Sequence, residues 1–208
     1  MYRRFQKRPY DTTPLAVILD FEIGARVGEL VALKSTDIKG SEIHIQRQEV
    51  KRYVRNHEGK LKFSHYEVVD YTKIKESDRY VYLTKKALEI INLITETNNK
   101  YGNYCEDYLF CRDKSRISKR GVQSRIHDGC KKIGIPVKSA HKIRKTYVST
   151  LVDSQLNIDE VRRQAGHADE KTTYRNYCFN RKTSKETGNI IEDALSKFND
   201  ARGYIKVN

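Results

Sequence analysis

The fold is decided by the stretch Thr13-Pro-Leu-Ala-Val-Ile-Leu-Asp-Phe-Glu-Ile23 and by the seven residues after it, Gly24-Ala-Arg-Val-Gly-Glu-Leu30. A proline stands at the first helical position, and the apolar residues behind it cover a broad face, which predicts a buried helix that ends at the glycine. A second short helix is expected from Arg26 to Leu33, with Arg26 and Glu29 on one face. Arg26 is therefore expected at a helix start, directly beside a glycine break.

Between residues 42 and 83 the apolar pattern changes to period two. β-Forming residues alternate with polar ones and are separated by charged or glycine-containing turns. We expect a small antiparallel sheet there, with a long excursion through Asn56-His-Glu-Gly59. The turn of its last hairpin is expected to carry Lys73, Lys75 and Arg79 at an exposed tip.

Helices predominate in the remainder of the chain, so the predicted fold class is α+β with mostly α-helical content. Caps and apolar spacing indicate a helix capped by Thr84 and further helices over residues 119–133, 139–151, 157–165, 172–178 and 186–198. His141 and Arg144 are three residues apart in one of them and so lie on one face. The last helix carries a narrow apolar stripe, made of Ile190, Ile191, Ala194, Leu195 and Phe198.

The charge balance indicates a polyanion as partner. The 208 residues contain 41 Lys and Arg against 27 Asp and Glu, which gives a formal net charge of +14. Phosphates neutralised by lysine and arginine provide most of the non-specific affinity of proteins for nucleic acid. A basic surface that serves only solubility is the alternative at this point.

Several classes of protein are disfavoured by what the sequence lacks. No apolar run approaches the ~20 residues that cross a bilayer, and the first residues lack the apolar stretch of a signal peptide, so we expect a cytoplasmic protein with no membrane partner. Its four cysteines, Cys105, Cys111, Cys130 and Cys178, form no CxxC pair and lie at no zinc-ligand spacing from a histidine. We therefore expect reduced thiols and no metal site.

Four short motifs combine arginine, lysine, histidine and tyrosine, which together suit a phosphodiester substrate. They are Gly24-Ala-Arg-Val-Gly-Glu-Leu30, Thr72-Lys-Ile-Lys-Glu-Ser-Asp-Arg-Tyr-Val-Tyr-Leu83, His141-Lys-Ile-Arg-Lys-Thr-Tyr-Val-Ser-Thr150 and Ala165-Gly-His-Ala-Asp-Glu-Lys-Thr-Thr-Tyr-Arg-Asn-Tyr177. In this order and spacing they resemble the boxes of the tyrosine recombinases, or phage-integrase family, which cut and rejoin DNA strands through a phosphotyrosine link. The resemblance covers that family's C-terminal catalytic domain and nearly all of this chain. It implies the family's catalytic-domain fold, with a small three-stranded antiparallel sheet.

The resemblance assigns roles to residues of all four motifs. Arg26 and Arg144 would clamp the non-bridging oxygens of the phosphate, and Lys73 would protonate the leaving 5′ oxygen. His141 would donate a hydrogen bond or move a proton nearby, and His167 would form a hydrogen bond with the scissile phosphate or the nucleophile. No metal ion and no other cofactor would be needed, because these side chains supply the positive charge.

By the same resemblance, Tyr177 would be the nucleophile that attacks phosphorus and leaves a 3′-phosphotyrosyl intermediate. Tyr174 competes for this role; we prefer Tyr177, because family members with a Thr-Thr pair after the Gly-His often carry the nucleophile nine or ten positions beyond that histidine. The roles of Arg26 and Lys73 also have competitors: Arg26 forms a helix-capping ion pair with a carboxylate such as that of Glu29, or Lys75 takes the place of Lys73. Three positions depart from the family pattern, namely Ala25, Tyr82 and Ala165.

The resemblance also implies partners and a setting. These are double-stranded DNA attachment sites, a monomer that becomes a homo-tetramer on DNA, accessory directionality factors, and the bacterial nucleoid of a host with an integrative element or prophage. Residues 1–182 would form the catalytic domain, and residues 183–208 a C-terminal helix and tail that is exchanged between protomers or folds back in cis. The family's N-terminal core-binding domain is absent from this sequence, which we therefore expect to be a fragment or a truncated chain. A type IB topoisomerase and a catalytically silent DNA-binding regulator are the alternatives to a site-specific recombinase.

Six further residues are candidates for contact with DNA outside the cleavage site. The helix that follows Ser118 is expected to present four side chains to a groove, and the helix before Gly166 two to the DNA backbone. The alternative is that both are ordinary solvated helix faces. The candidates are Lys119, Arg120, Gln123, Arg125, Arg162 and Arg163.

Overall fold

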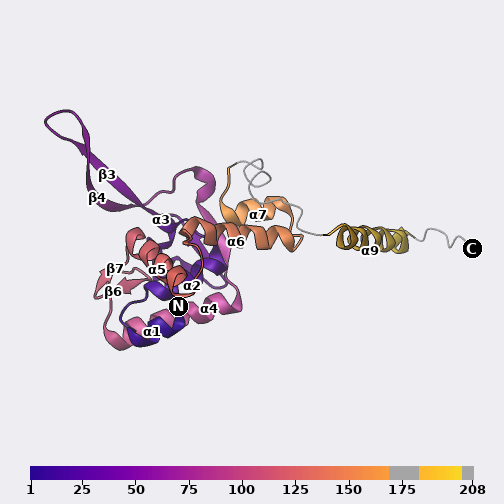
Figure 1. Cartoon of the computed structure of the whole chain (residues 1–208), viewed down its shortest axis with the longest axis horizontal. Coiled ribbons are helices and arrows are strands. Elements are labelled where there is room, and N and C mark those ends of the chain that lie inside the picture. The colour runs from indigo at the N-terminus through magenta and orange to yellow at the C-terminus, as the bar shows by residue number, and fades with distance from the viewer. Residues whose placement is uncertain (169–182, 203–208) are drawn as a thin grey trace, which may run out of the picture. The chain divides into compact units, whose positions relative to one another are not determined.

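The computed structural model describes residues 1–168 and 183–202. The chain divides into two compact units, Met1–Tyr177 and Cys178–Asn208, and each is described by itself. The first unit combines helices with small antiparallel sheets, which confirms the predicted α+β fold class (Figure 1). Within the described residues, no helix is both long enough and apolar enough to cross a membrane.

Helix α2 lies at the centre of the first unit because it packs against α4, α5 and α6. Its Leu15, Leu19 and Ile23 are completely buried. As predicted, α2 has a proline in its first turn and ends at Gly24, which adopts a left-handed φ of 57°. The helices of this unit are α1 (Tyr2–Lys7), α2 (Thr13–Ile23), α3 (Val27–Leu30), α4 (Lys85–Tyr101), α5 (Lys119–Lys132), α6 (Ala140–Asp153) and α7 (Ile158–Ala165).

The three-stranded sheet also agrees with expectation. Its order is β1 (Ile38–Lys39), β2 (Glu42–Ile45), β5 (Arg79–Tyr82), and all neighbours are antiparallel. Ile43 pairs with Val81, and both side chains are fully buried, so one face of the sheet closes the core. Cys111–Arg112 (β6) and Ser115–Arg116 (β7) form a separate two-residue ladder.

The excursion between these strands is different from the prediction. Residues around Tyr66 and Val68 were expected in the small sheet, but β3 (Gln48–Arg55) and β4 (Leu61–Val69) pair only with each other and extend away from the helices (Figure 1). All residues of β3 from Lys51 on and all residues of β4 up to Tyr66 are exposed. Period-two alternation therefore identified the strands correctly but not their partners, because these outer parts have no core to face.

Helices α6 and α7 pack on each other through a second, smaller apolar cluster. Val148 of α6 and Val161 and Ala165 of α7 are completely buried in it. Asn157 caps α7 by accepting a hydrogen bond from the Asp159 amide at 2.8 Å, and the helix ends, as predicted, at a left-handed glycine. This packing fixes the end of α7 over the face of α6.

The second unit contains α9 (Ser184–Arg202). The helix begins with a reciprocal cap, in which the amide and hydroxyl of Thr183 donate to the Glu186 carboxylate at 2.7 and 2.8 Å, and the Glu186 amide donates back to that hydroxyl at 3.3 Å. Ile191 and Leu195 of the predicted apolar stripe are 54% and 57% exposed. The expected helix over residues 172–178 and the side chain of Phe198 lie outside the described residues.

Candidate active site

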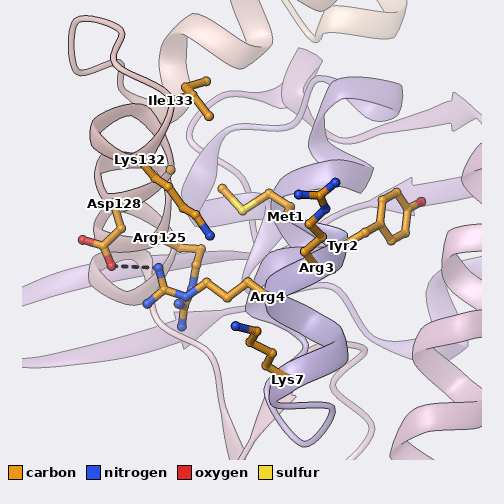
Figure 2. A pocket seen from close by; sticks show the side chains of 10 residues that line it. Met1, Tyr2, Arg3, Arg4, Lys7, Arg125, Asp128, Lys132 and Ile133 are labelled. Atoms are coloured by element: carbon orange, nitrogen blue, oxygen red, sulfur yellow. Dashed lines mark ion pairs between the residues drawn. The ribbon is translucent and has the colours of Figure 1, made fainter.

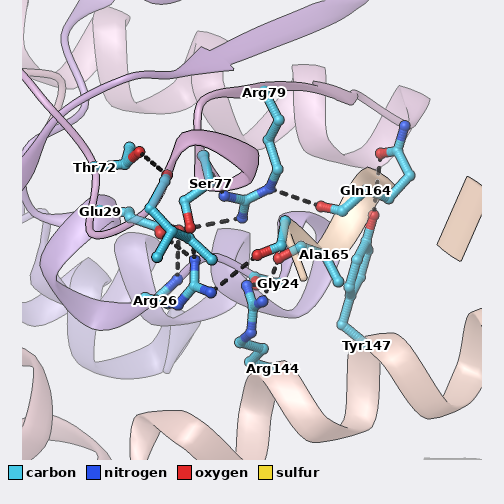
Figure 3. Close-up of polar contacts among 12 residues, drawn as sticks. Gly24, Arg26, Glu29, Thr72, Ser77, Arg79, Arg144, Tyr147, Gln164 and Ala165 are labelled. Carbon is cyan, nitrogen blue, oxygen red and sulfur yellow. Dashed lines mark hydrogen bonds and ion pairs between the residues drawn. The ribbon is translucent and has the colours of Figure 1, made fainter. Parts of the chain in front are cut away.

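Arg26 is held at the point where three segments meet. It is the residue before α3, and its amide donates to the Glu29 carboxylate at 3.0 Å. One guanidinium nitrogen donates to Glu29 at 2.7 Å and to the Ser77 hydroxyl at 2.8 Å, and another donates to the carbonyl of Gly166 at 3.0 Å (Figure 3). The ion pair with Glu29, which was the alternative to a phosphate-binding role, therefore exists. The side chain is still 31% exposed, so part of this fixed residue reaches solvent.

Arg144 reaches the same place from α6. Its guanidinium donates to the Gly24 carbonyl at 2.8 Å and also to the carbonyl of Ala165. Position 24 requires glycine for two reasons. Its φ is left-handed, and a Cβ atom there would overlap the ring of Tyr147. Arg144 thus connects the glycine break before Arg26 with the end of α7 (Figure 3).

The two predicted histidines have different surroundings. His141 is exposed one turn before Arg144 on α6, whereas His167 follows the left-handed Gly166 at the end of α7 and is only 7% exposed. Burial, and after it the charge of Arg144, lowers the pKa of both imidazoles, that of His167 to about 3. At neutral pH His167 is therefore uncharged and offers one donor and one acceptor nitrogen.

Lys73 lies on the exposed connection between β4 and β5, where it was expected. This connection contains a 3₁₀ turn, Lys75–Ser77, whose Ser77 hydroxyl contacts Arg26. The structure brings the connection to the site, while the choice between Lys73 and Lys75 as proton donor stays a prediction.

The expectation for Arg79 was wrong, because this residue is buried and only 5% exposed. Its guanidinium donates to the carbonyls of Gln164 at 2.8 Å and Ser77 at 2.9 Å and to the carboxylate of Glu29 at 3.1 Å. The signal was in the sequence: Arg79 is two residues before Val81, and a period-two pattern places both on the inner face of the strand. Arg79 thus belongs to the strand and not to the turn before it.

Two buried carboxyl groups respond oppositely to these guanidinium groups. Burial alone would raise the pKa of Glu29, but the charges of Arg79 and Arg26 outweigh it and the pKa lies below its ordinary value. For Asp20 on α2, complete burial raises the pKa well above the ordinary value despite the nearby charge of Arg144. Three arginines therefore face one carboxyl group that is held ionised and one that is driven toward the protonated form, which leaves excess positive charge for an anion.

Lys119 and Gln123 are half-buried and form hydrogen bonds within the protein, and their expected role as groove readers stays a prediction. The Lys119 amide donates to the Glu49 carboxylate at 3.2 Å, and its Nζ donates to the Glu49 carbonyl at 2.5 Å. The Gln123 amide group bonds to the Lys138 carbonyl and to the Ala140 amide, both at 3.2 Å, and so holds the start of α6.

Arg125 is likewise a structural residue. It is 8% exposed and forms an ion pair of 2.6 Å with Asp11. Its side chain contributes to the wall of an open basic pocket of about 710 Å³ between α1 and α5, in which Arg4 pairs with Asp128 at 3.3 Å (Figure 2). Helical spacing could not distinguish Arg125 from an exposed neighbour, because its carboxylate partner is 114 residues away.

The remaining three predicted DNA contacts are accessible to different degrees. Arg120 is exposed on α5. Arg163 is exposed and pairs with Glu160 at 2.6 Å, while Arg162 is half-buried and lies 3.6 Å from Asp159. Arg162 and Arg163 also line an open cavity of about 510 Å³ that His167 faces. Their contact with DNA stays a prediction.

The described part of the site is a cluster of Arg26, Arg144, His141 and His167, which we call the basic cluster, supported by Glu29 and Arg79. Tyr174 and Tyr177 lie outside the described residues, so the choice between them stays a prediction. A mostly helical α+β fold that brings two arginines and two histidines together is that of the catalytic domain of a tyrosine recombinase. The chain belongs to the phage integrase family, whose model matches residues 10–184.

Individual relatives agree with this membership. The chain is 25% identical over 184 residues to the integrase of Staphylococcus phage L54a, a match that covers 84% of this chain and 49% of the phage protein. The chain thus spans about half the length of this curated relative.

Solved structures share the fold. An integrase of the Tn1549 transposon, in complex with transposon right end DNA, superimposes with a TM-score of 0.66 at 16% identity, over 88% of this chain and 58% of that one. The XerA recombinase gives a TM-score of 0.60 at 20% identity, over 99% and 63% of the two chains. A lambda integrase dimer bound to a core site gives a TM-score of 0.53 at 13% identity, over 83% of this chain and 54% of that one.

Proposed function

We propose that this chain is the catalytic part of a site-specific DNA recombinase, an integrase that cuts and rejoins strands through a 3′-phosphotyrosyl intermediate. The observation that carries the proposal is the convergence of Arg26, Arg144 and His167 from three separate segments, with the Arg26 side chain 31% exposed. Family membership supports the same reaction. The catalytic domain would comprise residues 1–182, with residues 183–208 as a tail that is exchanged between protomers.

In the proposed reaction the two arginines bind the phosphate. Arg26 and Arg144 are held by carbonyl and hydroxyl acceptors, so their guanidinium groups are preorganised for the non-bridging oxygens. Such donors stabilise the charge that develops in the transition state more than that of the ground state, which is what lowers the barrier. His141, exposed on the same face as Arg144, would add a further donor.

Proton transfer completes the proposed step. The Tyr177 hydroxyl loses its proton, its oxygen forms a bond to phosphorus, and the bond from phosphorus to the 5′ oxygen breaks. His141, exposed beside Arg144, takes the first proton, His167 forms a hydrogen bond with the phosphate or with the nucleophile, and Lys73 gives a proton to the leaving oxygen. Attack by a 5′ hydroxyl on the phosphotyrosine reverses the sequence and rejoins the strand without ATP or a metal ion.

The proposed partners follow from charge and family. The substrate would be a double-stranded DNA attachment site, which a net charge of +14 attracts. The protein would be a monomer alone and a homo-tetramer on DNA, with accessory factors that set the direction of the reaction, in the nucleoid of a bacterial host. DNA contact by Arg120, Arg162 and Arg163 belongs to the same proposal.

Covalent trapping tests the proposal. The protein is incubated with a nicked duplex that carries the candidate attachment site, in the presence of EDTA, and SDS-resistant protein–DNA complexes are counted. We expect a complex with the wild type and with Tyr104→Phe, an exposed control tyrosine on the connection after α4, and none with Tyr177→Phe.

Any different outcome corrects the proposal in a defined way. Loss with Tyr174→Phe but not with Tyr177→Phe would transfer the nucleophile to Tyr174. Binding of DNA without any covalent complex would indicate a silent regulator, and relaxation of supercoils without site preference would indicate a topoisomerase.

A further inference from the structure

Arg79 is a buried arginine that the proposed reaction does not use. Its three hydrogen bonds go to three segments, namely the 3₁₀ turn at Ser77, the Glu29 carboxylate behind Arg26, and the Gln164 carbonyl near the end of α7 (Figure 3). Its side chain is 2% exposed and that of Glu29 1%. Burial of a guanidinium costs free energy. A buried arginine that bonds to three segments therefore indicates that the relative positions of these segments are fixed through it.

The turn that carries His167 packs directly on Arg79. A Cβ atom at Gly166 would approach Cδ and Nη1 of Arg79 to 2.9 Å, and the φ of Gly166 is +63°. From the other side, Arg26 donates to the Gly166 carbonyl at 3.0 Å. Glu29 holds both guanidinium groups, one through each carboxylate oxygen. The Gly166–His167 turn is thus clamped between Arg26 and Arg79.

We propose that Arg79 is a positioning residue for DNA cleavage, which sets the Gly166–His167 turn against Arg26 and places a permanent positive charge beside the imidazole. The effect on cleavage rests on the proposed function. The placement of the turn and of the Arg79 charge beside His167 does not. Burial first, then the charges of Arg144, Arg26 and Arg79 and of His141, lower the pKa of His167 to about 3. The open cavity of about 510 Å³ that His167 faces is also lined by other charged groups. These are Glu76, Asp78, Asp159, Glu160, Arg162 and Arg163.

Two substitutions separate the geometry from the charge. Arg79→Lys keeps a cation, but a single ammonium on a flexible stem cannot reproduce the planar fork that bonds three segments. Arg79→Gln removes the charge as well. Arg47→Gln is the matched control, because Arg47 is also buried and also pairs with a buried carboxylate, Asp37, at 2.5 Å, outside the basic cluster.

The experiment measures the rate of covalent complex formation and the titration of His167 by NMR, assigned with His167→Gln. Both Arg79 variants are expected to lose about 10²-fold in rate, the effect of a misplacement of about 1 Å, with DNA affinity near that of the wild type. In the wild type and Arg79→Lys, His167 is expected to stay neutral to the lowest pH at which the protein is folded. In Arg79→Gln, His167 is expected to titrate at a higher pH than in the wild type. Arg47→Gln is expected to change neither the rate of covalent complex formation nor the titration of His167.

The result that overturns the inference is a rate in both Arg79 variants equal to that of Arg47→Gln, or a His167 titration that is the same in Arg79→Gln and Arg79→Lys. Absence of a covalent complex in the wild type would refute the proposed function instead. The titration still tests whether Arg79 places its charge beside the His167 imidazole, because it needs neither DNA nor catalysis.

Discussion

Arg144 and Arg125 show two uses of a buried arginine in the same molecule. Both lie on helices that pack against α2, at 2% and 8% exposure, and both were predicted to contact DNA. Arg125 pairs with the carboxylate of Asp11, which cancels its charge. Arg144 donates to the carbonyls of Gly24 and Ala165, and a carbonyl orients a guanidinium without neutralising it. The two arginines are similarly buried, and the bonds named here differ in their acceptors, which are a carboxylate for Arg125 and carbonyls for Arg144.

The largest effect is expected from Arg144→Lys. A lysine keeps the charge but cannot bond both carbonyls and a phosphate oxygen together, so we expect cleavage to fall by about 10² to 10³-fold, with DNA affinity little changed. Single-turnover cleavage of the nicked duplex measures the loss. Arg125→Lys is the control and should cleave within a few-fold of the wild type. A loss below tenfold in Arg144→Lys would remove Arg144 from the transition-state contacts.

Arg125→Gln is expected to affect stability instead. Removal of the guanidinium leaves the Asp11 carboxylate buried without its partner, a change that costs about 3 kcal/mol. Urea denaturation should show this loss of unfolding free energy, and Asp11→Asn combined with Arg125→Gln should recover part of it. The salt dependence of DNA binding should not change. A shallower dependence would return Arg125 to the DNA-contacting residues.

This contrast also explains which parts of the structure the sequence could predict. Caps and breaks are local, so the end of α2 at Gly24 and the cap of α5 at Ser118 were placed correctly, and motif spacing brought Arg26 and Arg144 to one site. The partner of a buried charge is not local. Nothing near Arg125 in the sequence identifies Asp11 as its partner, and nothing near β3 shows that its strand lacks a neighbour in the three-stranded sheet.

A smaller effect is expected from Asp20→Asn, which tests whether a carboxylate neutralises Arg144. Because burial raises the pKa of Asp20, the folded protein holds a proton that the unfolded chain releases above pH ~4. The wild type therefore loses stability as pH rises through this range, by about 1.4 kcal/mol per unit of pKa difference. Asparagine carries no such proton, so the variant should match the wild type near pH 4 and be the more stable protein at pH 7.

Urea denaturation at several pH values measures this difference, with Asp128→Asn, at a half-buried surface residue, as control. A variant that is less stable than the wild type at pH 7 would contradict the expectation. Asp20 would then be ionised and paired with Arg144, and both buried arginines would belong to neutralised pairs.

The smallest effect is expected from Arg120→Gln, the exposed neighbour of Arg125 on α5. An exposed arginine that contacts one phosphate should weaken binding by a few-fold for all DNA sequences and reduce the slope of log K against log salt by about one. Cleavage at saturating DNA should not change, because Arg120 lies outside the basic cluster. Fluorescence anisotropy over a salt series measures the slope, with Arg125→Gln as the matched variant. If only Arg120→Gln alters the slope, α5 contacts DNA through its exposed face and uses its buried arginine for the fold alone; equal slopes would leave α5 a solvated helix.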